Sequence, residues 1–298
     1  MAASISVIVC TRNRAANLRP TLESVSKTII PSGWEVELLV VDNGSSDGTS
    51  VVVNEARFSN VVLRYISEPV PGLCNARNTG IREAVGKIIL FTDDDVRVPT
   101  NWIEGMCRPI LEGEADAVQG GVKIAPHLDR PWLTGALRVW VASVEDPVVP
   151  PAGLVGANMA FERRVLGITG GFDPRLGAGA CGFFEDTMFG WALERAGQRI
   201  LYQPNVAVEH HFSADRLTFK AYFQTARRMA ESRAIVMRIL DANIVRPSLV
   251  SVLKELPGLA IRSITQIIRY MIDRRPDAGF VVRYFRIRLW YALRKSSL

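Results

Sequence analysis

Cysteine is scarce in this sequence, and no two cysteines form a metal-binding pair. The 298 residues contain four cysteines that lie far apart, at Cys10, Cys74, Cys107 and Cys181. Such spacing argues against a disulfide framework and against a zinc ribbon, which needs C-x-x-C pairs. We therefore expect a protein of a reducing compartment, the cytoplasm.

Long apolar runs and a secretory leader are also missing. No apolar run of the sequence approaches the roughly 20 residues of a transmembrane helix. Met1 to Ser4 lead straight into an apolar stretch, without the basic region and the small-residue cleavage site of a signal peptide. We expect a chain that has no secretory signal and does not span a membrane.

Two common nucleotide-binding loops are absent. The first apolar stretch, Ser6–Cys10, leads into Thr-Arg-Asn-Arg instead of G-x-G-x-x-G, which argues against a dinucleotide-binding oxidoreductase. Residues 80–87 have one residue too many between their glycines for a P-loop, and Ile88 stands where Ser or Thr is needed. A nucleotidyltransferase would typically carry a Gly-rich basic loop after its first strand, which is not seen. It remains the alternative, beside a catalytically inactive binding or scaffold protein.

What the sequence does contain is an alternation of strand-like and helix-like segments. Short apolar runs predict buried strands at 6–10, 36–41, 61–66, 87–92, 117–124 and 200–208. Helical spacing predicts helices at 17–27, 49–57, 75–85 and 185–196. Continuous apolar runs are typical of a mostly parallel sheet covered by helices, so we predict an α/β fold. The Pro-, Trp- and Gly-rich segment 126–151 suggests a loop or a substrate-facing lid.

The net charge of +6 is unevenly distributed along the chain. Residues 216–298 contain 17 Lys and Arg against 5 Asp and Glu, whereas the rest of the chain contains 19 against 25. We therefore divide the chain into a body, residues 1–215, and a basic extension, residues 216–298. The extension is predicted to be helical, with breaks at Pro247 and Pro257.

Apolar residues recur at helical spacing in this extension, interleaved with arginines, which predicts amphipathic helices. Such helices bind anionic membrane surfaces, with apolar residues inward and arginines on the head groups. They also pack on the rest of the protein or on another subunit, as most amphipathic helices do. We favour peripheral membrane contact, keep a homo-oligomer as the alternative, and expect no nucleic acid because no binding motif accompanies the charge.

Three adjacent carboxylates, Asp93 to Asp95, follow the apolar strand 87–92. They repel one another, so their placement is costly unless a cation lies between them. Alternate side chains of an extended segment point the same way, so Asp93 and Asp95 can share a ligand while Asp94 turns aside. Such oxygen ligands suit Mg²⁺ or Mn²⁺ held jointly with substrate phosphates. A solvated acidic turn is the alternative, and the triplet alone does not decide.

Two further acidic sites follow predicted elements. Asp42 closes the second strand in a turn-rich segment, where it could accept a hydrogen bond from a base or ribose, or only stabilise the turn. Asp186, beside Glu185 at the start of a predicted helix, could be a general base or a helix cap. Taken singly, each favours the structural interpretation.

Basic residues near the same strand ends also have two interpretations. Arg77, beside Asn78 near the start of a predicted helix, could meet a diphosphate or base, or form a surface salt bridge. His210 and His211 follow the strand 200–208, and neighbours on a strand point opposite ways. At most one of them would usually complete a metal site, and a partly exposed surface pair is the alternative.

The order of these segments resembles the family 2 glycosyltransferases, which have a nucleotide-sugar-binding GT-A fold. Seven segments match in the family's order and cover about residues 4–212: SVIVCTRNR (6–14), VDNGSSDGT (41–49), GLCNARNTGI (72–81), FTDDDV (91–96), VGANMAFERRV (155–165), GGFDPRL (170–176) and EDTMFGWALERAGQRILYQPNVAVEHH (185–211). The resemblance implies a GT-A catalytic domain over 1–215, Rossmann-like with helices flanking a mostly parallel sheet, followed by the helical extension.

The resemblance also implies roles for particular residues. Thr11 and Arg12 would line the base pocket, and Asp42 would bond the base or ribose. Asp93 and Asp95 match the family's DxD element. Asp93 would face the ribose or the metal, and Asp95 would hold the metal that bridges the donor diphosphate.

Asp186 matches the family's expected catalytic base. His210, with His211 as the alternative, would join the metal site. Gly156 to Asn158 would shape the donor-sugar and acceptor region. The remaining nucleotide-sugar-binding residues implied by the resemblance are Arg77, Asp94, Asn158 and Glu185.

The reaction implied by the resemblance is inverting and needs Mg²⁺ or Mn²⁺. The Gln-x-x-Arg-Trp motif of processive synthases is not found after Asp186, which favours transfer of a single sugar. A UDP-sugar is the default donor. The acceptor would be a lipid-linked or cell-surface glycan or a small molecule, and the enzyme would act in the cytoplasm or on the cytoplasmic face of a membrane.

Overall fold

The chain forms two compact units, each described here by itself. The computed structural model describes residues 3–146, 151, 153–240 and 248–295. One unit comprises Met1–Leu128, Ala142–Gly179 and Glu185–Phe212, and the other comprises Asp129–Val141, Ala180–Phe184 and Ser213–Leu298. The assignment of a catalytic domain to residues 1–215 and of an extension to 216–298 stays a prediction.

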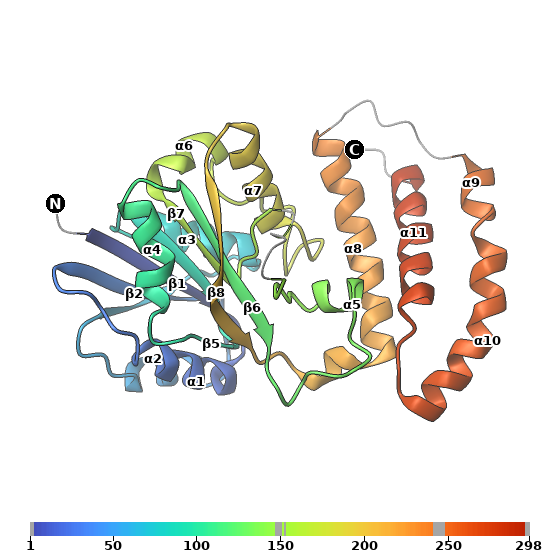
Figure 1. Cartoon of the computed structure of the whole chain (residues 1–298), viewed down its shortest axis with the longest axis horizontal. Coiled ribbons are helices and arrows are strands. Elements are labelled where there is room, and N and C mark those ends of the chain that lie inside the picture. The colour runs from blue at the N-terminus through green and yellow to red at the C-terminus, as the bar shows by residue number, and fades with distance from the viewer. Residues whose placement is uncertain (1–2, 147–150, 152, 241–247, 296–298) are drawn as a thin grey trace. The chain divides into compact units, whose positions relative to one another are not determined.

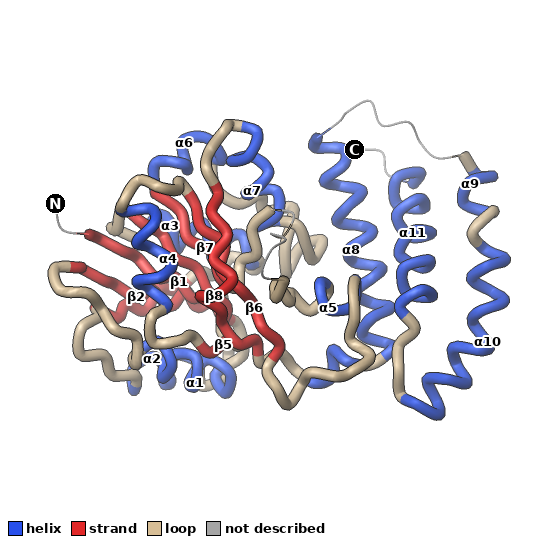
Figure 2. The backbone as a smooth tube through the Cα atoms, viewed as in Figure 1, coloured by secondary structure: helices blue, strands red, loops and turns tan. Residues whose placement is uncertain are grey.

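The first unit is built on a mixed sheet in the order β3-β2-β1-β4-β7-β6-β8-β5 (Figures 1 and 2). Strands β3, β2, β1 and β4 run parallel, β7 is antiparallel to β4 and β6, and β5 is antiparallel to β8. The strands are β1 (Ala3–Thr11), β2 (Trp34–Asp42), β3 (Val62–Ser67), β4 (Ile88–Asp93), β5 (Val96–Arg97), β6 (Ala117–Ile124), β7 (Asn158–Glu162) and β8 (Ile200–His210).

Helices cover both faces of this sheet, which explains the continuous apolar runs. Successive strand side chains point to opposite faces. Val7 and Val9 of β1 therefore join the core beneath one helical layer, while Ile8 joins the core on the other side. The predicted α/β class is confirmed. The helices of this unit are α1 (Ala15–Val25), α2 (Thr49–Glu55), α3 (Leu73–Glu83), α4 (Trp102–Leu111), α6 (Leu166–Thr169) and α7 (Glu185–Arg195).

Four of these elements, α4, α6, β5 and β7, escaped sequence analysis. Helix α4 buries Trp102, Ile103 and Met106 despite Pro109 inside it. Strands β5 and β7 are short, and β7 is antiparallel to its neighbours. Within the expected loop 126–151, the described residues form the short helix α5 (Ala136–Val139), and the prediction of a lid is untested.

The second unit is a set of helices. They are α5, α8 (Phe219–Leu240), α9 (Leu249–Leu253), α10 (Leu256–Asp273) and α11 (Ala278–Lys295). Aromatic side chains join α8 to α11, with the ring centroids of Phe223 and Tyr284 4.2 Å apart. Pro257 lies in the first turn of α10. Proline is tolerated there because backbone N–H groups of the first turn have no hydrogen-bond partner within the helix. Pro247 lies outside the described residues, and the predicted helical character is confirmed.

No helix within the described ranges is both long and apolar enough to cross a bilayer.

Asn158 is a structural residue at the start of β7, which corrects the expectation that it contacts the nucleotide sugar. Its side chain is fully buried. Its Oδ1 accepts from the Trp102 indole N–H at 2.8 Å, and its Nδ2 donates to the carbonyls of Gly121 at 2.9 Å and Val206 at 2.8 Å. The amide thus connects β7 to α4, β6 and β8, and its donor and acceptor groups are occupied by the protein itself.

Replacing Asn158 with Ala is expected to lower the free energy of unfolding by about 3 kcal/mol or more, because one N–H and two carbonyls lose buried partners. Urea unfolding measures this change. The control is Asn54→Ala, at an exposed position of α2, which should unfold like the wild type. A stable Asn158→Ala protein that has lost nucleotide affinity would instead restore a binding role.

Candidate active site

Several strands of the first unit end at one edge of the sheet in polar residues. β1, β2 and β4 run parallel, with Cys10 opposite Asp93 and Thr11 opposite Asp42. Strand β5 pairs Val96 with His210 and so brings the end of β8 to the same place. The carboxyl ends of parallel strands are where α/β proteins bind ligands. Residues more than 100 positions apart along the chain therefore meet at this edge.

Asp93, Asp95 and His210 form a cluster with the composition of a metal site. One potential ligand atom from each lies within 4.8 Å of the other two. His210 Nε2 lies 3.4 Å from Asp95 Oδ1, and both side chains are almost fully buried. Two carboxylate oxygens and one imidazole nitrogen suit Mg²⁺ or, better, Mn²⁺, which accepts nitrogen ligands. The structure thus brings together His210 and the two predicted carboxylates.

Arg14 supplies positive charge to the same carboxylates, and sequence analysis missed it. Its Nη2 donates to Asp95 Oδ2 at 2.5 Å, and its Nη1 lies 3.1 Å from Asp94 Oδ1. Asp94 turns away from the cluster, as predicted, and also accepts a hydrogen bond from Thr11 Oγ1 at 2.7 Å. Arg12, which was singled out instead, is exposed. Three adjacent acids need a cation, and a basic residue that follows a neighbouring strand can supply one. This was the signal that could have identified Arg14.

The three carboxylates differ in how readily they ionise. Burial raises the pKa of Asp94 to about 7, although the nearby Arg14 guanidinium acts in the opposite direction. Burial also raises the pKa of Asp93, against the effect of Arg77. For Asp95 the effect of burial is overcome by His210 and Arg14, which hold its pKa well below the usual range. The pKa of Asp95 is therefore the lowest of the three.

A buried ion pair lies behind this cluster. Arg77 Nη1 donates to Glu185 Oε1 at 2.9 Å, and Arg77 Nη2 lies 3.8 Å from Asp93 Oδ1. The guanidinium also stacks on Phe172, 5.2 Å from the ring centroid. The side chain is only 4% exposed, which rules out the surface salt bridge considered above. Burial, together with Asp186, raises the pKa of Glu185 to about 7.

Asp186 occupies the first turn of α7, where the helix N-terminus favours a carboxylate. Its Oδ2 accepts a hydrogen bond from the Gly156 N–H at 2.7 Å, and its Oδ1 accepts one from the Thr187 N–H at 2.7 Å. Gly156 is also the point where a Cβ atom would lie 2.0 Å from Arg77 Nη2. The segment 156–158 therefore meets both Arg77 and Asp186.

Two loops at this edge are fastened together by side-chain hydrogen bonds. Asn13, in the left-handed conformation with φ 53°, accepts from the Ser46 N–H at 2.7 Å, and its own N–H donates to Ser45 Oγ at 2.8 Å. Asp42 accepts from the Ser45 N–H at 2.8 Å and from the Tyr65 hydroxyl at 2.7 Å. Asp42 therefore stabilises the turn, and its predicted contact with a base or ribose stays a prediction.

A cavity of about 350 Å³ opens between these loops and the carboxylates. Thr11, Arg12 and Arg14 line it from the first loop, and Asp93 and Asp94 line it from the end of β4. Its other lining residues are Cys10, Asn43, Gly72, Leu73, Ala76, Ala178 and Gly179. Sequence analysis missed Asn43, whose side chain bonds the Glu68 carbonyl and the Gly72 N–H. The cavity joins an exposed arginine to the acidic cluster.

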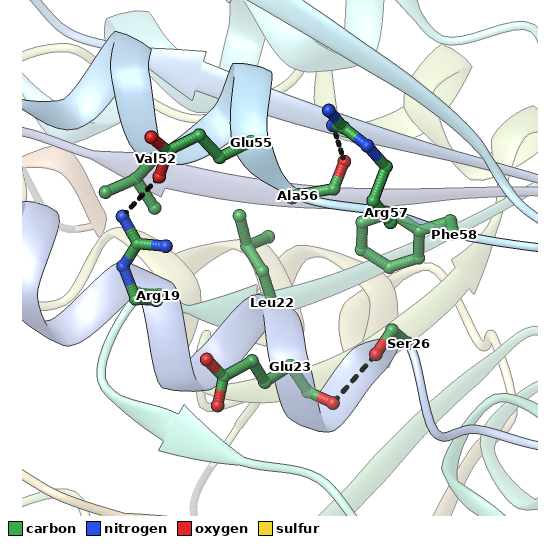
Figure 3. Close-up of a pocket in the computed structure, with 9 residues that line it drawn as sticks. All are labelled: Arg19, Leu22, Glu23, Ser26, Val52, Glu55, Ala56, Arg57 and Phe58. Carbon is green, nitrogen blue, oxygen red and sulfur yellow. Dashed lines mark hydrogen bonds and ion pairs between the residues drawn. The ribbon is translucent and has the colours of Figure 1, made fainter.

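A second groove lies between α1 and α2, away from these residues (Figure 3). Both arginines that line it already have partners. Arg19 donates to Glu55 at 2.7 Å, and Arg57 donates to the carbonyl of Ala56 at the end of α2 (Figure 3). This groove shares no residue with the acidic cluster, and the site is therefore assigned to the sheet edge.

Comparison with known sequences relates the chain to glycosyltransferases. Residues 6–139 match the model of glycosyl transferase family 2. Glycosyltransferase AglE of Haloferax volcanii is 34% identical over 121 residues, which are 40% of this chain and 39% of AglE. A pre-mycofactocin glycosyltransferase of Mycobacterium tuberculosis is 25% identical over 218 residues, which are 69% of this chain and 42% of that protein. The chain thus spans less than half the length of these relatives.

Solved structures share the fold. A mannosyltransferase of Pyrobaculum calidifontis in complex with GDP-Man and Mn²⁺ superposes with a TM-score of 0.64 at 20% identity, over 97% of this chain and 86% of the other. S. aureus TarS 1-349 in complex with UDP-GlcNAc superposes with a TM-score of 0.53 at 19% identity, over 98% and 89% of the two chains. The predicted GT-A fold is confirmed.

Replacing Arg14 with Ala is expected to tighten the binding of Mn²⁺ alone by about tenfold, because Asp94 and Asp95 lose a competing positive charge. Loss of these ion pairs should also lower the thermal stability of the metal-free protein. Electron paramagnetic resonance of free Mn²⁺ and thermal unfolding measure the two effects. Arg12→Ala is the control, since Arg12 lines the same cavity. Equal Mn²⁺ affinity in the wild type and Arg14→Ala would contradict this account of Arg14.

Proposed function

We propose, from the match of residues 6–139 to the model of glycosyl transferase family 2, that the chain transfers a sugar from a nucleoside-diphosphate sugar to an acceptor hydroxyl. Relatives that bear the name glycosyltransferase support this proposal. The observation that carries the proposal is the cluster of Asp93, Asp95 and His210 beside a cavity at the strand ends.

The donor site is the cavity beside the cluster. We assign the base pocket to Thr11 and Arg12, with Asp42 supporting the loop, and the diphosphate to the rim near Asp93 to Asp95. The solved neighbours support this class of donor, since they hold GDP-Man or UDP-GlcNAc. A UDP-sugar remains the first choice among the nucleotides.

The cluster fits a divalent ion, because two carboxylates and an imidazole can converge on one point. Asp93, Asp95 and His210 would hold Mg²⁺ or Mn²⁺ there. When bound, such an ion stabilises the negative charge that develops on the leaving diphosphate. Two neighbours contain Mn²⁺, one with GDP-Man and one with UDP, which supports this choice.

Asp186 is proposed as the catalytic base. The N–H groups of Gly156 and Thr187 hold its carboxylate in place. The proton of the acceptor hydroxyl passes to Asp186 as the acceptor oxygen bonds to the anomeric carbon. The bond from that carbon to the diphosphate oxygen breaks on the opposite side. A single displacement of this kind inverts the configuration.

Arg77 and Glu185 act as positioning residues in this proposal. Their ion pair is buried, and Arg77 contacts Asp93 on its inner side. They would fix Asp93 toward the metal and hold the start of α7, which carries Asp186. Direct contact of either side chain with the donor, expected above, is therefore replaced by an indirect role.

The acceptor is proposed to be a glycan, a lipid-linked glycan or a small molecule, and the transfer is proposed to be non-processive. We retain the cytoplasm, or the cytoplasmic face of a membrane, as the proposed location and cell-surface glycan synthesis as the proposed pathway class. The proposal of a homo-oligomer also stands.

Calorimetric titration with UDP, GDP and dTDP, each with Mn²⁺ and with EDTA, tests the donor site. One nucleotide is expected to bind in the presence of Mn²⁺, and Asp95→Asn should weaken it by at least about tenfold because a metal ligand is lost. Asp215→Asn, which removes an exposed carboxylate, is the charge-matched control. Binding that is indifferent to both EDTA and Asp95→Asn would refute a metal-dependent donor site.

Asp186→Asn is expected to lower turnover by about 10²- to 10⁴-fold, because the acceptor or water loses its base. Release of nucleoside diphosphate from the bound donor sugar measures turnover without knowledge of the acceptor. Donor affinity should stay at the wild-type value, since Asp186 lies outside the metal cluster. The control is Glu194→Gln, at an exposed position of the same helix. Wild-type turnover in Asp186→Asn would assign the base elsewhere.

A further inference from the structure

The largest concentration of exposed apolar side chains lies on α9 and α10. Among the described residues, ten of the twenty exposed large hydrophobic side chains fall between residues 249 and 272. Ile261 and Ile272 are each 75% exposed, and Ile264 is 69% exposed. The others are Leu249, Val250, Leu253, Leu256, Ile267, Ile268 and Met271. Exposure on this scale is costly in water, so this face requires a partner.

These side chains occupy one face of what is nearly a single helix. Lys254 and Glu255, between α9 and α10, both have right-handed helical dihedrals, so the helical path continues from Leu249 to Asp273. At 100° per residue the ten apolar positions fall within an arc of about 160°. Gln266 lies outside this arc and is buried. Figure 1 shows α10 beside α11, and all ten side chains of the apolar arc are exposed.

Positive charge accompanies this face. Five basic side chains along the segment and at its end are exposed: Lys254, Arg262, Arg269, Arg274 and Arg275. Two of the three acids nearby have partners, since Glu255 pairs with Arg286 at 3.1 Å and Asp277 accepts from Gln266. Asp273 alone is an exposed acid in this stretch. The surface around the apolar arc is therefore strongly basic.

We propose that the face formed by α9 and α10 binds to an anionic phospholipid surface, with the helix lying in the plane of the membrane. The isoleucines and Met271 would enter the boundary between head groups and acyl chains, and the arginines would contact lipid phosphates. Arg262 and Arg269 interrupt the apolar sequence of α10, which suits a helix that lies in the plane of the membrane rather than one that spans it. This inference concerns the second unit only and does not depend on the proposed donor site.

Charge decides between a membrane and a second copy of the chain. Two copies that met through this face would bring two sets of exposed basic residues together, and like charges repel. An anionic lipid surface has the complementary charge, and each Lys or Arg near it contributes to attraction within a Debye length. The basic rim thus favours a lipid partner over self-association.

The whole chain is mixed with one of two kinds of vesicle, and the bound protein is measured by flotation. One kind contains phosphatidylcholine alone, and the other contains phosphatidylcholine with about one fifth phosphatidylglycerol. We expect binding to the anionic vesicles, weaker binding to the neutral ones, and loss of binding at high salt. Ile261→Gln combined with Ile264→Gln should weaken binding by at least about tenfold, because the two inserted side chains become polar. Arg262→Gln combined with Arg269→Gln should weaken it by about tenfold at low salt only.

Matched controls carry the same changes at exposed positions of the other unit. Ile29→Gln combined with Val85→Gln removes apolar residues that are 62% and 77% exposed, and Arg82→Gln combined with Arg195→Gln removes two exposed arginines. Both controls should bind like the wild type. Because every substituted side chain is exposed, each variant is expected to fold. Thermal unfolding checks this.

Absence of wild-type binding to anionic vesicles would overturn the proposal, as would equal binding by the Ile261/Ile264 variant. Light scattering of the same proteins measures their oligomeric state and so tests the alternative occupant, a second copy of the chain. If the wild type is a dimer that the Ile261/Ile264 variant dissociates, while vesicle binding is unchanged, a second copy covers this face and the proposal is wrong. Nucleotide binding is expected to be the same in all these variants, so its failure would concern the donor site alone.

Discussion

The first unit is organised around carboxylates that are held largely out of water at the end of one sheet. An isolated buried carboxylate is far too costly to persist, so each one here needs a cation or a hydrogen-bond donor. Arg14 forms ion pairs with Asp94 and Asp95, and Arg77 forms ion pairs with Asp93 and Glu185. The same low dielectric that makes these pairs necessary would strengthen the attraction of the site for a divalent ion.

This arrangement explains why polar groups from distant segments sit at such close range. Arg77 stacks on Phe172 behind the cluster, so its position is set by the core as well as by charge. Gly156 leaves room for the guanidinium, since any Cβ there would collide with it. The carboxylates are therefore held by packing, and a ligand that enters the cavity meets groups that are already oriented.

The two units differ in how far they bury their apolar side chains. In the first unit both faces of the sheet are covered, and Val7 and Ile8 of one strand enter separate cores. In the second unit α8 and α11 share an aromatic contact, but α10 keeps an apolar arc exposed. An exposed arc beside arginines is a surface feature, and its chemistry indicates what should bind there.

The sequence by itself determined the α/β class, most strands and helices of the first unit, and the candidate carboxylates, because these depend on local runs, spacing and turn residues. It also indicated Asp186 and His210. Only the tertiary structure decided that Asn158 serves the sheet, that Arg14 rather than Arg12 meets the carboxylates, and that Arg77 is buried. Those outcomes depend on which strand ends become neighbours, and short elements such as β5 and β7 gain their stability from that pairing rather than from local propensity.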